Sequence, residues 1–201
     1  MNNLGYIVLA YFLGAIPFGY ILPKLFKGED VREYGSGNIG FTNVLRTFGP
    51  ILAGLVLLGD ASKGFVSVWL AVQTGSELLP LATAIAAVVG HSWTLFLRFQ
   101  GGRGLATSAG AILALMPKVV GLLFLVWLAI LLLFRYVSLA SVSVAIAFPI
   151  VTLIAGYSWP YCLFSLILAL VVIWRHRPNI KRLLAGTELK LGQKGERKSA
   201  R

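Results

Sequence analysis

Hydrophobic residues form eight long runs along the chain, and most of the charged residues lie in the short segments between them. The runs cover residues 4–23, 44–59, 61–75, 78–97, 105–116, 119–134, 137–157 and 159–174. A helix needs about 20 apolar residues to cross the hydrocarbon core of a bilayer. The second and third runs fit one helix over residues 44–75 that is polar or broken at residues 60–63. The pattern therefore predicts an all-α integral membrane protein, built as a bundle of seven transmembrane helices.

The composition agrees with this prediction. Hydrophobic residues make up 58% of the 201 positions and charged residues 12%, whereas a soluble domain contains roughly 25% charged residues. A chain of this length can form one bundle of membrane helices without a separate soluble domain. We therefore interpret residues 1–201 as a single multi-pass membrane domain with a basic tail from about residue 175.

The distribution of charge predicts the orientation of the chain. The net charge is +11, and residues 175–201 contain nine Lys or Arg and two Glu. Basic residues concentrate on the cytoplasmic side of membrane proteins, so we expect a cytoplasmic C-terminus, with the N-terminus outside. Such a tail also attracts anionic lipid. It lacks the interleaved aromatic residues typical of nucleic-acid binding, so no nucleic-acid partner is expected.

Residues 35–40 read GSGNIG and match the G-x-G-x-x-G pattern of dinucleotide-binding turns. That fingerprint requires a βαβ unit, which this chain lacks, so we reject a Rossmann fold. The local chemistry still suits an anion, because the backbone N–H groups of such a turn and of a following helix start can bind phosphate. The candidate groups are Gly35, Ser36, Gly37, Asn38, Thr42, Asn43 and Arg46. The alternative is a capped turn in which Ser36 or Thr42 begins a helix.

A second glycine turn, QGGRGLAT, occupies residues 100–107. Glycines again precede a helix, with a cation among them; the candidate residues are Gly101, Gly102, Arg103, Gly104 and Thr107. A tight turn with an interfacial arginine is the alternative. Two such turns on one membrane face favour phosphate binding.

The segment WRHRPNIKR over residues 174–182 follows the last apolar run. Its four basic residues fit a simple membrane boundary. His176 and Asn179, three positions apart, are candidates for one shared site, because histidine serves as a general base or phosphate ligand. Glu188 follows and either orients His176 or caps the tail.

Asp60 and Lys63 lie inside a long apolar stretch. Residues three apart share a helix face, and ionisable residues within membranes tend to pair and to be functional. A structural ion pair and a pair that lines the site both remain open. For His91 we favour a structural hydrogen bond. No metal site and no cofactor is predicted, because the few carboxylates are scattered and neither histidine has ligand-like neighbours.

Taken in order, these motifs resemble the bacterial acyl-phosphate:glycerol-3-phosphate acyltransferases over nearly the whole chain. The matching segments are GSGN at 35–38, TNVLR at 42–46, DASKG at 60–64, GH at 90–91, GGRG at 101–104, RYVSLA at 135–140 and RHRPNIKRL at 175–183. The glycine-rich GAIPFG at 14–19 and the G-x-E at 186–188 also fit. Two positions depart from the family pattern. Arg103 stands where the family usually has Lys, and Phe41 replaces a small residue beside Thr42.

The resemblance implies a reaction and a location. The expected reaction transfers a fatty acyl group from acyl phosphate to the 1-hydroxyl of sn-glycerol 3-phosphate, giving lysophosphatidic acid and phosphate in phospholipid biosynthesis. The expected fold is a seven-helix bundle in the bacterial cytoplasmic (inner) membrane, with its active site on the cytoplasmic side. Membrane lipid and a functional link to the soluble enzyme that makes acyl phosphate are also implied.

Under this resemblance we expect two phosphates and an acyl carbonyl to be held at the cytoplasmic turns. The expected catalytic residues are Ser36, Arg46, Arg103, His176 and Asn179. The expected binding residues are Gly35, Gly37, Asn38, Thr42, Asn43, Lys63, Gly101, Gly102, Gly104, Thr107 and Glu188. The general base stays open among His176, Asp60 and a substrate phosphate. The rival class is a small transporter, since buried ion pairs and helix-end glycines also occur there.

Overall fold

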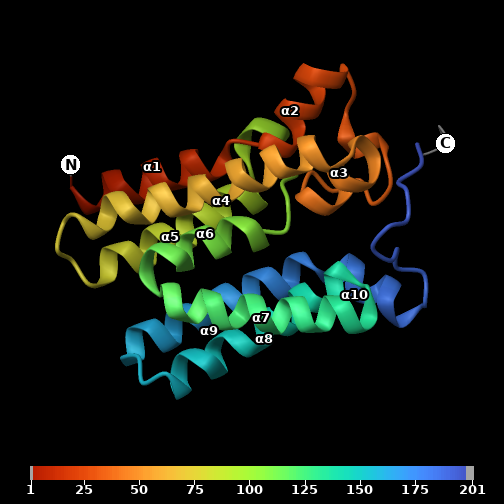
Figure 1. The fold of residues 1–201 in the computed structure, drawn as a ribbon. Helices are drawn as coiled ribbons and strands as arrows, with labels where there is room; N and C mark the ends of the chain where they lie inside the picture. Colours follow the sequence, from red (N-terminus) through yellow and green to blue (C-terminus); the bar gives the residue numbers. More distant parts are fainter. Residues whose placement is uncertain (1, 198–201) are drawn as a thin grey trace.

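The computed structural model describes residues 2–197, and every extended regular element within this range is a helix (Figure 1). The α-helices are α1 (Asn3–Ala15), α2 (Phe18–Lys27), α3 (Phe41–Phe48), α4 (Pro50–Val72), α5 (Leu78–Ser92), α6 (Leu105–Leu115), α7 (Pro117–Phe134), α8 (Val137–Ile154), α9 (Trp159–Arg175) and α10 (Arg177–Leu184). Two short 3-10 helices are η1 (Val31–Glu33) and η2 (Leu95–Leu97). Residues 198–201, the end of the predicted basic tail, lie outside the described part of the chain.

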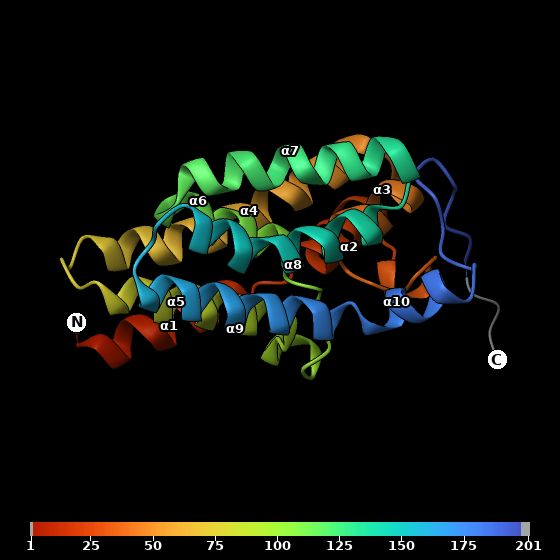
Figure 2. The ribbon, with the colours of Figure 1, turned by 90° about the horizontal axis from the view of Figure 1, so that it is seen from below.

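The long helices run side by side in two groups (Figures 1 and 2). One group contains α1, α4, α5 and α6, and the other contains α7, α8 and α9. The short helices α2, α3 and α10 lie together at one end, near the C-terminus, whereas the N-terminus lies at the opposite end. The glycine turns and the basic tail therefore meet at one end of the bundle.

Small residues allow the close contact between α4 and α6. A Cβ added at Gly64 would overlap the carbonyl oxygen of Thr107, and one at Gly110 would overlap that of Ala61. Close packing through small residues is typical of helix pairs in membranes, where burial of apolar surface contributes little to association. This contact fixes the first turn of α6 against the middle of α4.

Six helical segments in the described residues are long and apolar enough to cross a membrane. They are Asn3–Lys27, Pro50–Val72, Leu78–Leu97, Pro117–Phe134, Val137–Ile154 and Trp159–Leu184. The apolar helix Leu105–Leu115 is shorter. The all-helical prediction is thus confirmed, with six helices of spanning length.

Two of the predicted helices break at positions where the sequence pattern predicted no break. The predicted helix 4–23 is interrupted at Ile16 and Pro17, because proline has no N–H to continue the ladder. The predicted helix 44–75 is not broken at Asp60, since α4 continues through this position. Its break lies at Gly49, whose φ of 92° is favoured by glycine.

Candidate functional site

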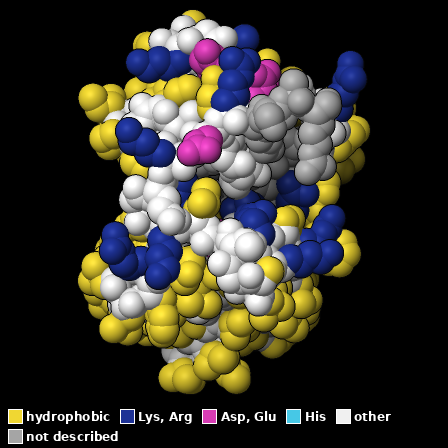
Figure 3. Space-filling view, turned by 90° about the vertical axis from the view of Figure 1, so that its right-hand side faces the viewer, with side chains coloured by type: hydrophobic (Ala, Val, Ile, Leu, Met, Phe, Trp, Pro, Cys, Tyr) yellow, Lys and Arg dark blue, Asp and Glu magenta, His cyan; other side chains and the backbone are white. Residues whose placement is uncertain are grey.

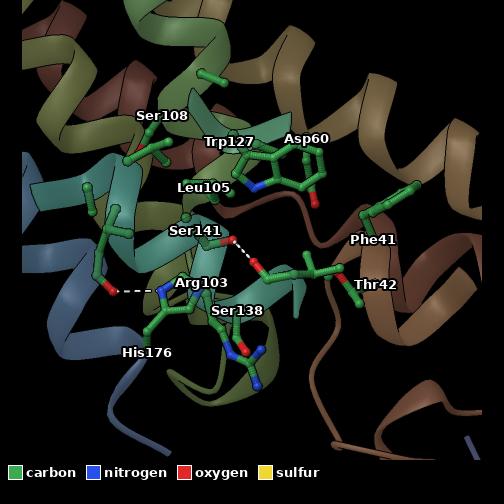
Figure 4. A pocket seen from close by; sticks show the side chains of 18 of the residues that line it. Phe41, Thr42, Asp60, Arg103, Leu105, Ser108, Trp127, Ser138, Ser141 and His176 are labelled. Atoms are coloured by element: carbon green, nitrogen blue, oxygen red, sulfur yellow. Dashed lines mark hydrogen bonds between the residues drawn. The ribbon is translucent and has the colours of Figure 1, made fainter. Parts of the chain in front are cut away.

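A cavity of about 450 Å³ lies between the two helix groups (Figure 4). Its charged end is lined by Ser36, Asn38, Gly40, Phe41, Thr42, Arg46, Arg103, Gly104, Ser138, His176, Asn179 and Glu188. Farther into the bundle the lining becomes apolar, with Leu57, Ile112, Val120, Leu123, Phe124, Trp127, Ala145, Phe148 and Leu168. A ligand with a charged head and a long apolar chain fits this division.

Asn43 organises the first glycine turn from inside. Its side chain is 1% exposed and lies outside the cavity lining. Nδ2 donates to the carbonyl oxygens of Val31, Tyr34 and Asn38 at 3.0–3.1 Å, and Oδ1 accepts from the N–H of Ser36 at 3.0 Å. A buried amide with its groups occupied in this way serves to shape the loop.

Other N–H groups of this turn also bond within the chain. The N–H of Gly35 donates to the carbonyl of Glu196 and that of Gly37 to Tyr34, both at 2.8 Å. After this turn, Phe41 and Thr42 in the first turn of α3 line the cavity. The start of a helix carries unpaired N–H groups and a partial positive charge.

The second glycine turn places the start of α6 at the same cavity. Gly104 is its N-cap, with a φ of 84° in the left-handed region. Arg175 donates from Nε to the carbonyl of Gly102 at 3.0 Å and from a terminal nitrogen to that of Gly101 at 2.9 Å. The sequence had suggested only a membrane-boundary role for Arg175, whereas its side chain braces this turn.

Arg103 and Arg46 bring positive charge to the cavity. Within residues 2–197, Arg103 makes no hydrogen bond and no ion pair, and its guanidinium points into the cavity (Figure 4). Burial, followed by repulsion from Arg182, lowers the pKa of Arg103 to about 10, so it is charged at neutral pH. Burial also lowers the pKa of Arg46, which donates to the carbonyl of Leu189 at 2.6 Å and has a buried, unpartnered Nε.

His176 and Asn179 lie at the α9–α10 junction, 3% and 1% exposed. The Nδ1 atom of His176 is 2.8 Å from the carbonyl oxygen of Val172. Because a carbonyl only accepts, Nδ1 carries the proton and Nε2 of the neutral ring is an acceptor. Val172, and not Glu188, therefore orients this histidine. The Oδ1 atom of Asn179 is buried without a partner.

The carboxylate of Glu188 accepts hydrogen bonds from three side chains. Oε1 accepts from Ser138 Oγ and Asn179 Nδ2, and Oε2 accepts from Arg182 Nε, each at 2.7 Å. Burial raises the pKa of Glu188, but these three hydrogen bonds outweigh it, so the net shift is downward. Ser138 was absent from the predicted site residues. Its partner lies fifty positions away in the chain, which no local pattern indicates.

Residues 188–197, here called the C-terminal strap, cross from α10 to the first glycine turn. Leu191 N–H donates to the carbonyl of Arg135 at 2.7 Å, and Gly195 N–H donates to that of Arg46 at 3.2 Å. Near the end of the strap, the carbonyl of Glu196 accepts a hydrogen bond from the N–H of Gly35. The strap therefore ties α8 and α10 to α3 at the charged end of the cavity.

The sixteen predicted site residues fall into two sets. Nine line the cavity: Ser36, Asn38, Thr42, Arg46, Arg103, Gly104, His176, Asn179 and Glu188. Seven are not part of that lining: Gly35, Gly37, Asn43, Lys63, Gly101, Gly102 and Thr107. Lys63 is 5% exposed and pairs with Asp60 at 2.8 Å, so the structure places it within the protein rather than against a ligand.

Comparison with known proteins points to one family. The family model described as glycerol-3-phosphate acyltransferase matches residues 4–186. The glycerol-3-phosphate acyltransferase of Syntrophomonas wolfei is 46% identical over 194 residues, covering 96% of this chain and 100% of that protein. Glycerol-3-phosphate acyltransferase 2 of Moorella thermoacetica is 50% identical over 189 residues, covering 94% and 97%.

Solved structures agree with the sequence comparison. The crystal structure of an integral membrane glycerol 3-phosphate acyltransferase in its glycerol 3-phosphate form matches with a TM-score of 0.92 at 40% identity and covers 96% of both chains. The lysophosphatidic acid form matches with a TM-score of 0.87 at 38% identity, with the same coverage.

Proposed function

Because the chain belongs to the glycerol-3-phosphate acyltransferase family, we propose that it transfers a fatty acyl group from acyl phosphate to the 1-hydroxyl of sn-glycerol 3-phosphate. The products are lysophosphatidic acid and inorganic phosphate. One observation carries the proposal: two helix starts and two incompletely paired guanidinium groups, Arg46 and Arg103, meet at one cavity that continues into an apolar channel.

The charged end suits two phosphates. Each of α3 and α6 presents N–H groups at its start, and an arginine accompanies each: Arg46 with α3 and Arg103 with α6. Arginine binds phosphate through two parallel hydrogen bonds. Acyl phosphate and glycerol 3-phosphate each bring one such group, so both substrates have a place without any metal ion.

The apolar end suits the acyl chain. Along α8 the lining changes from Ser138 and Ser141 near the charged end to Ala145 and Phe148 deeper in the bundle. On the side of α4 and α7, Leu57 and Phe124 line the cavity and are 39% and 56% exposed. In a membrane these exposed side chains face lipid, so an acyl chain can enter sideways.

The chemistry then requires little more than positioning and charge neutralisation. The substrate hydroxyl attacks the carbonyl carbon, a new ester C–O bond forms, and the C–O bond to phosphate breaks. The hydroxyl proton leaves with the released phosphate, either directly or through Nε2 of His176. Asp60 is the weakest candidate for the base, since its Oδ1 atom is already paired with Lys63.

The same proposal includes the topology. Counting the shorter α6 as a span gives seven transmembrane helices, with the N-terminus outside and the C-terminus in the cytoplasm of the bacterial inner membrane. The charged end of the bundle supports this orientation: Figure 3, which views that end, displays Lys and Arg side chains spread over it. Residues 1–201 would then form one catalytic domain, supplied by the soluble enzyme that makes acyl phosphate.

The test uses purified protein in detergent with glycerol 3-phosphate and either palmitoyl phosphate or palmitoyl-CoA. Formation of lysophosphatidic acid from palmitoyl phosphate alone is expected, with a large loss in Arg103→Ala. Arg177→Ala is the matched control, because Arg177 lies outside the cavity and stacks on Trp174. Folded protein that makes no product from either donor would overturn the proposal and leave a transporter as the next hypothesis.

A further inference from the structure

A buried charged cluster lies beside the second glycine turn, and two of its members, Asp60 and His91, also line the cavity. The cluster consists of Asp60, Lys63 and His91, which are 2%, 5% and 4% exposed. Lys63 Nζ lies 2.8 Å from Asp60 Oδ1 and donates to the carbonyl of Ile16 at 2.7 Å. The Nδ1 atom of His91 lies 3.5 Å from the same carboxylate oxygen. The reaction described above assigns His91 no role.

His91 supports the turn from one side. The N–H of Gly102 donates to the carbonyl of His91 at 3.1 Å. A Cβ added at Gly102 would overlap Nε2 of the His91 ring, and it would lie 2.7 Å from Cε1 and 3.2 Å from Cδ2. Gly102 therefore sits against the imidazole ring, with no room for a methyl group between them.

Arg175 supports the turn by binding the turn's backbone carbonyl groups. Its guanidinium binds the carbonyl oxygens of Gly101 and Gly102 and lies over the ring of Trp93, 5.1 Å from the centroid. The two residues that precede Arg103 are thus held between His91 and Arg175. A displacement at Gly102 is transmitted to Arg103, the next residue in the chain.

We propose that His91 is a positioning residue: its imidazole ring carries Gly102 and thereby sets where Arg103 and the first turn of α6 face the cavity. The carboxylate of Asp60 lies beside Nδ1 of the ring at 3.5 Å, and Lys63 links this carboxylate to the break between α1 and α2 at Ile16. The inference rests on the proposed function, in which the start of α6 binds a substrate phosphate.

A comparison of a single variant with a double variant tests this contact. Gly102→Ala is expected to lower kcat/KM by about 100-fold, because its methyl group meets the ring and displaces Arg103. In the double variant with His91→Ala the methyl group occupies space that the ring has left. The double variant is therefore expected to be about tenfold more active than Gly102→Ala alone, a coupling typical of residues in contact.

Gly101→Ala is the matched control. A Cβ at Gly101 would overlap the carbonyl oxygen of His91 and lie 2.8 Å from the carbonyl carbon of Ser92. Both are backbone atoms, so removing the His91 side chain leaves the overlap in place. The variant His91→Ala/Gly101→Ala should stay as impaired as Gly101→Ala. If His91→Ala does not accumulate, His91→Asn carries the same comparison, since it removes Nε2 and Cε1 but keeps a polar partner for Asp60.

The kinetic readout separates positioning from general instability and from direct catalysis. We expect His91→Asn to raise the KM for one of the two substrates by about tenfold, with a smaller effect on the other. Additive effects of His91 and Gly102 substitutions, or equal changes for both substrates, would overturn the positioning role. A wild-type protein that does not acylate glycerol 3-phosphate would instead overturn the proposed function, so the two failures are distinguishable.

Discussion

Replacing Glu188 by glutamine tests the account of the strap and of Asn179. Glutamine keeps the shape of the side chain and removes its charge. If its oxygen stays on Ser138 and Asn179, its NH₂ group faces Arg182 Nε, which is also a donor, so the 2.7 Å ion pair is lost. The side chain of Arg182 is 33% exposed, and solvent screening limits that loss to about 1 kcal/mol. The two remaining bonds become neutral, and each weakens by about 1 kcal/mol.

The expected total loss is therefore about 3 kcal/mol. At neutral pH the midpoint of thermal unfolding in detergent should fall by at least about 6 °C. Acyl transfer should fall as well, because the hydrogen bond that holds Asn179 in place becomes weaker. Glu196→Gln is the control in the same strap, since Glu196 is exposed. An unchanged midpoint and unchanged activity in Glu188→Gln would show that these three hydrogen bonds do not stabilise the fold or hold Asn179.

The same substitution predicts a pH dependence. The pKa of Glu188 is lowered by folding from its ordinary value of 4.5. Its stabilising contribution is therefore fully present above pH 4.5 and is lost as the pH falls through the lower folded-state pKa. The difference in unfolding midpoint between wild type and Glu188→Gln should be constant near neutrality and shrink below pH 4.5. A difference that grows on acidification would contradict the assigned hydrogen bonds.

Three further comparisons between variants give expected outcomes. Arg103→Lys keeps the positive charge and should stay within about tenfold of wild type, whereas Arg103→Ala should lower kcat/KM by about 100-fold in steady-state assays. Asn43→Ala orphans several buried backbone groups and should cost about 2–3 kcal/mol in thermal unfolding, whereas Asn38→Ala, on the cavity lining, should lower activity with little change in stability. Lys63→Met leaves Asp60 buried without its cation and should cost about 3–5 kcal/mol, and Asp60→Asn added to it should recover most of that loss. An equally unstable double variant would contradict the ion-pair assignment.

The sequence pattern predicted the helices well because hydropathy reports directly on the contact of each segment with lipid. Hydropathy does not predict where a helix breaks within an apolar run. The breaks at Pro17 and Gly49 were therefore missed, although both residues are visible in the sequence. Their effect depends on neighbours: Thr94 Oγ1, for example, donates to the carbonyl of Ala15 beside the first break.

The sequence predicted which residues gather at the site better than it predicted what each of them binds. Glycines and hydrogen-bonding side chains indicated two anion-binding turns, and nine of the predicted residues line one cavity. The sequence could not show that Asn43 and Tyr34 occupy N–H groups of the first turn, since these partners are set by the folded loop. Arg175 was assigned a boundary role because its partners, Gly101 and Gly102, lie more than seventy positions away.

Acyl transfer and phosphate transfer from acyl phosphate differ in the bond that is broken, and an isotope label distinguishes them. Wild-type protein would be given glycerol 3-phosphate and palmitoyl phosphate that carries ¹⁸O in the oxygen between carbonyl carbon and phosphorus. Acyl transfer at the charged end of the cavity predicts that the label appears in inorganic phosphate and that lysophosphatidic acid contains none of it. Label retained in palmitate, with phosphate transferred to the glycerol, would contradict the account.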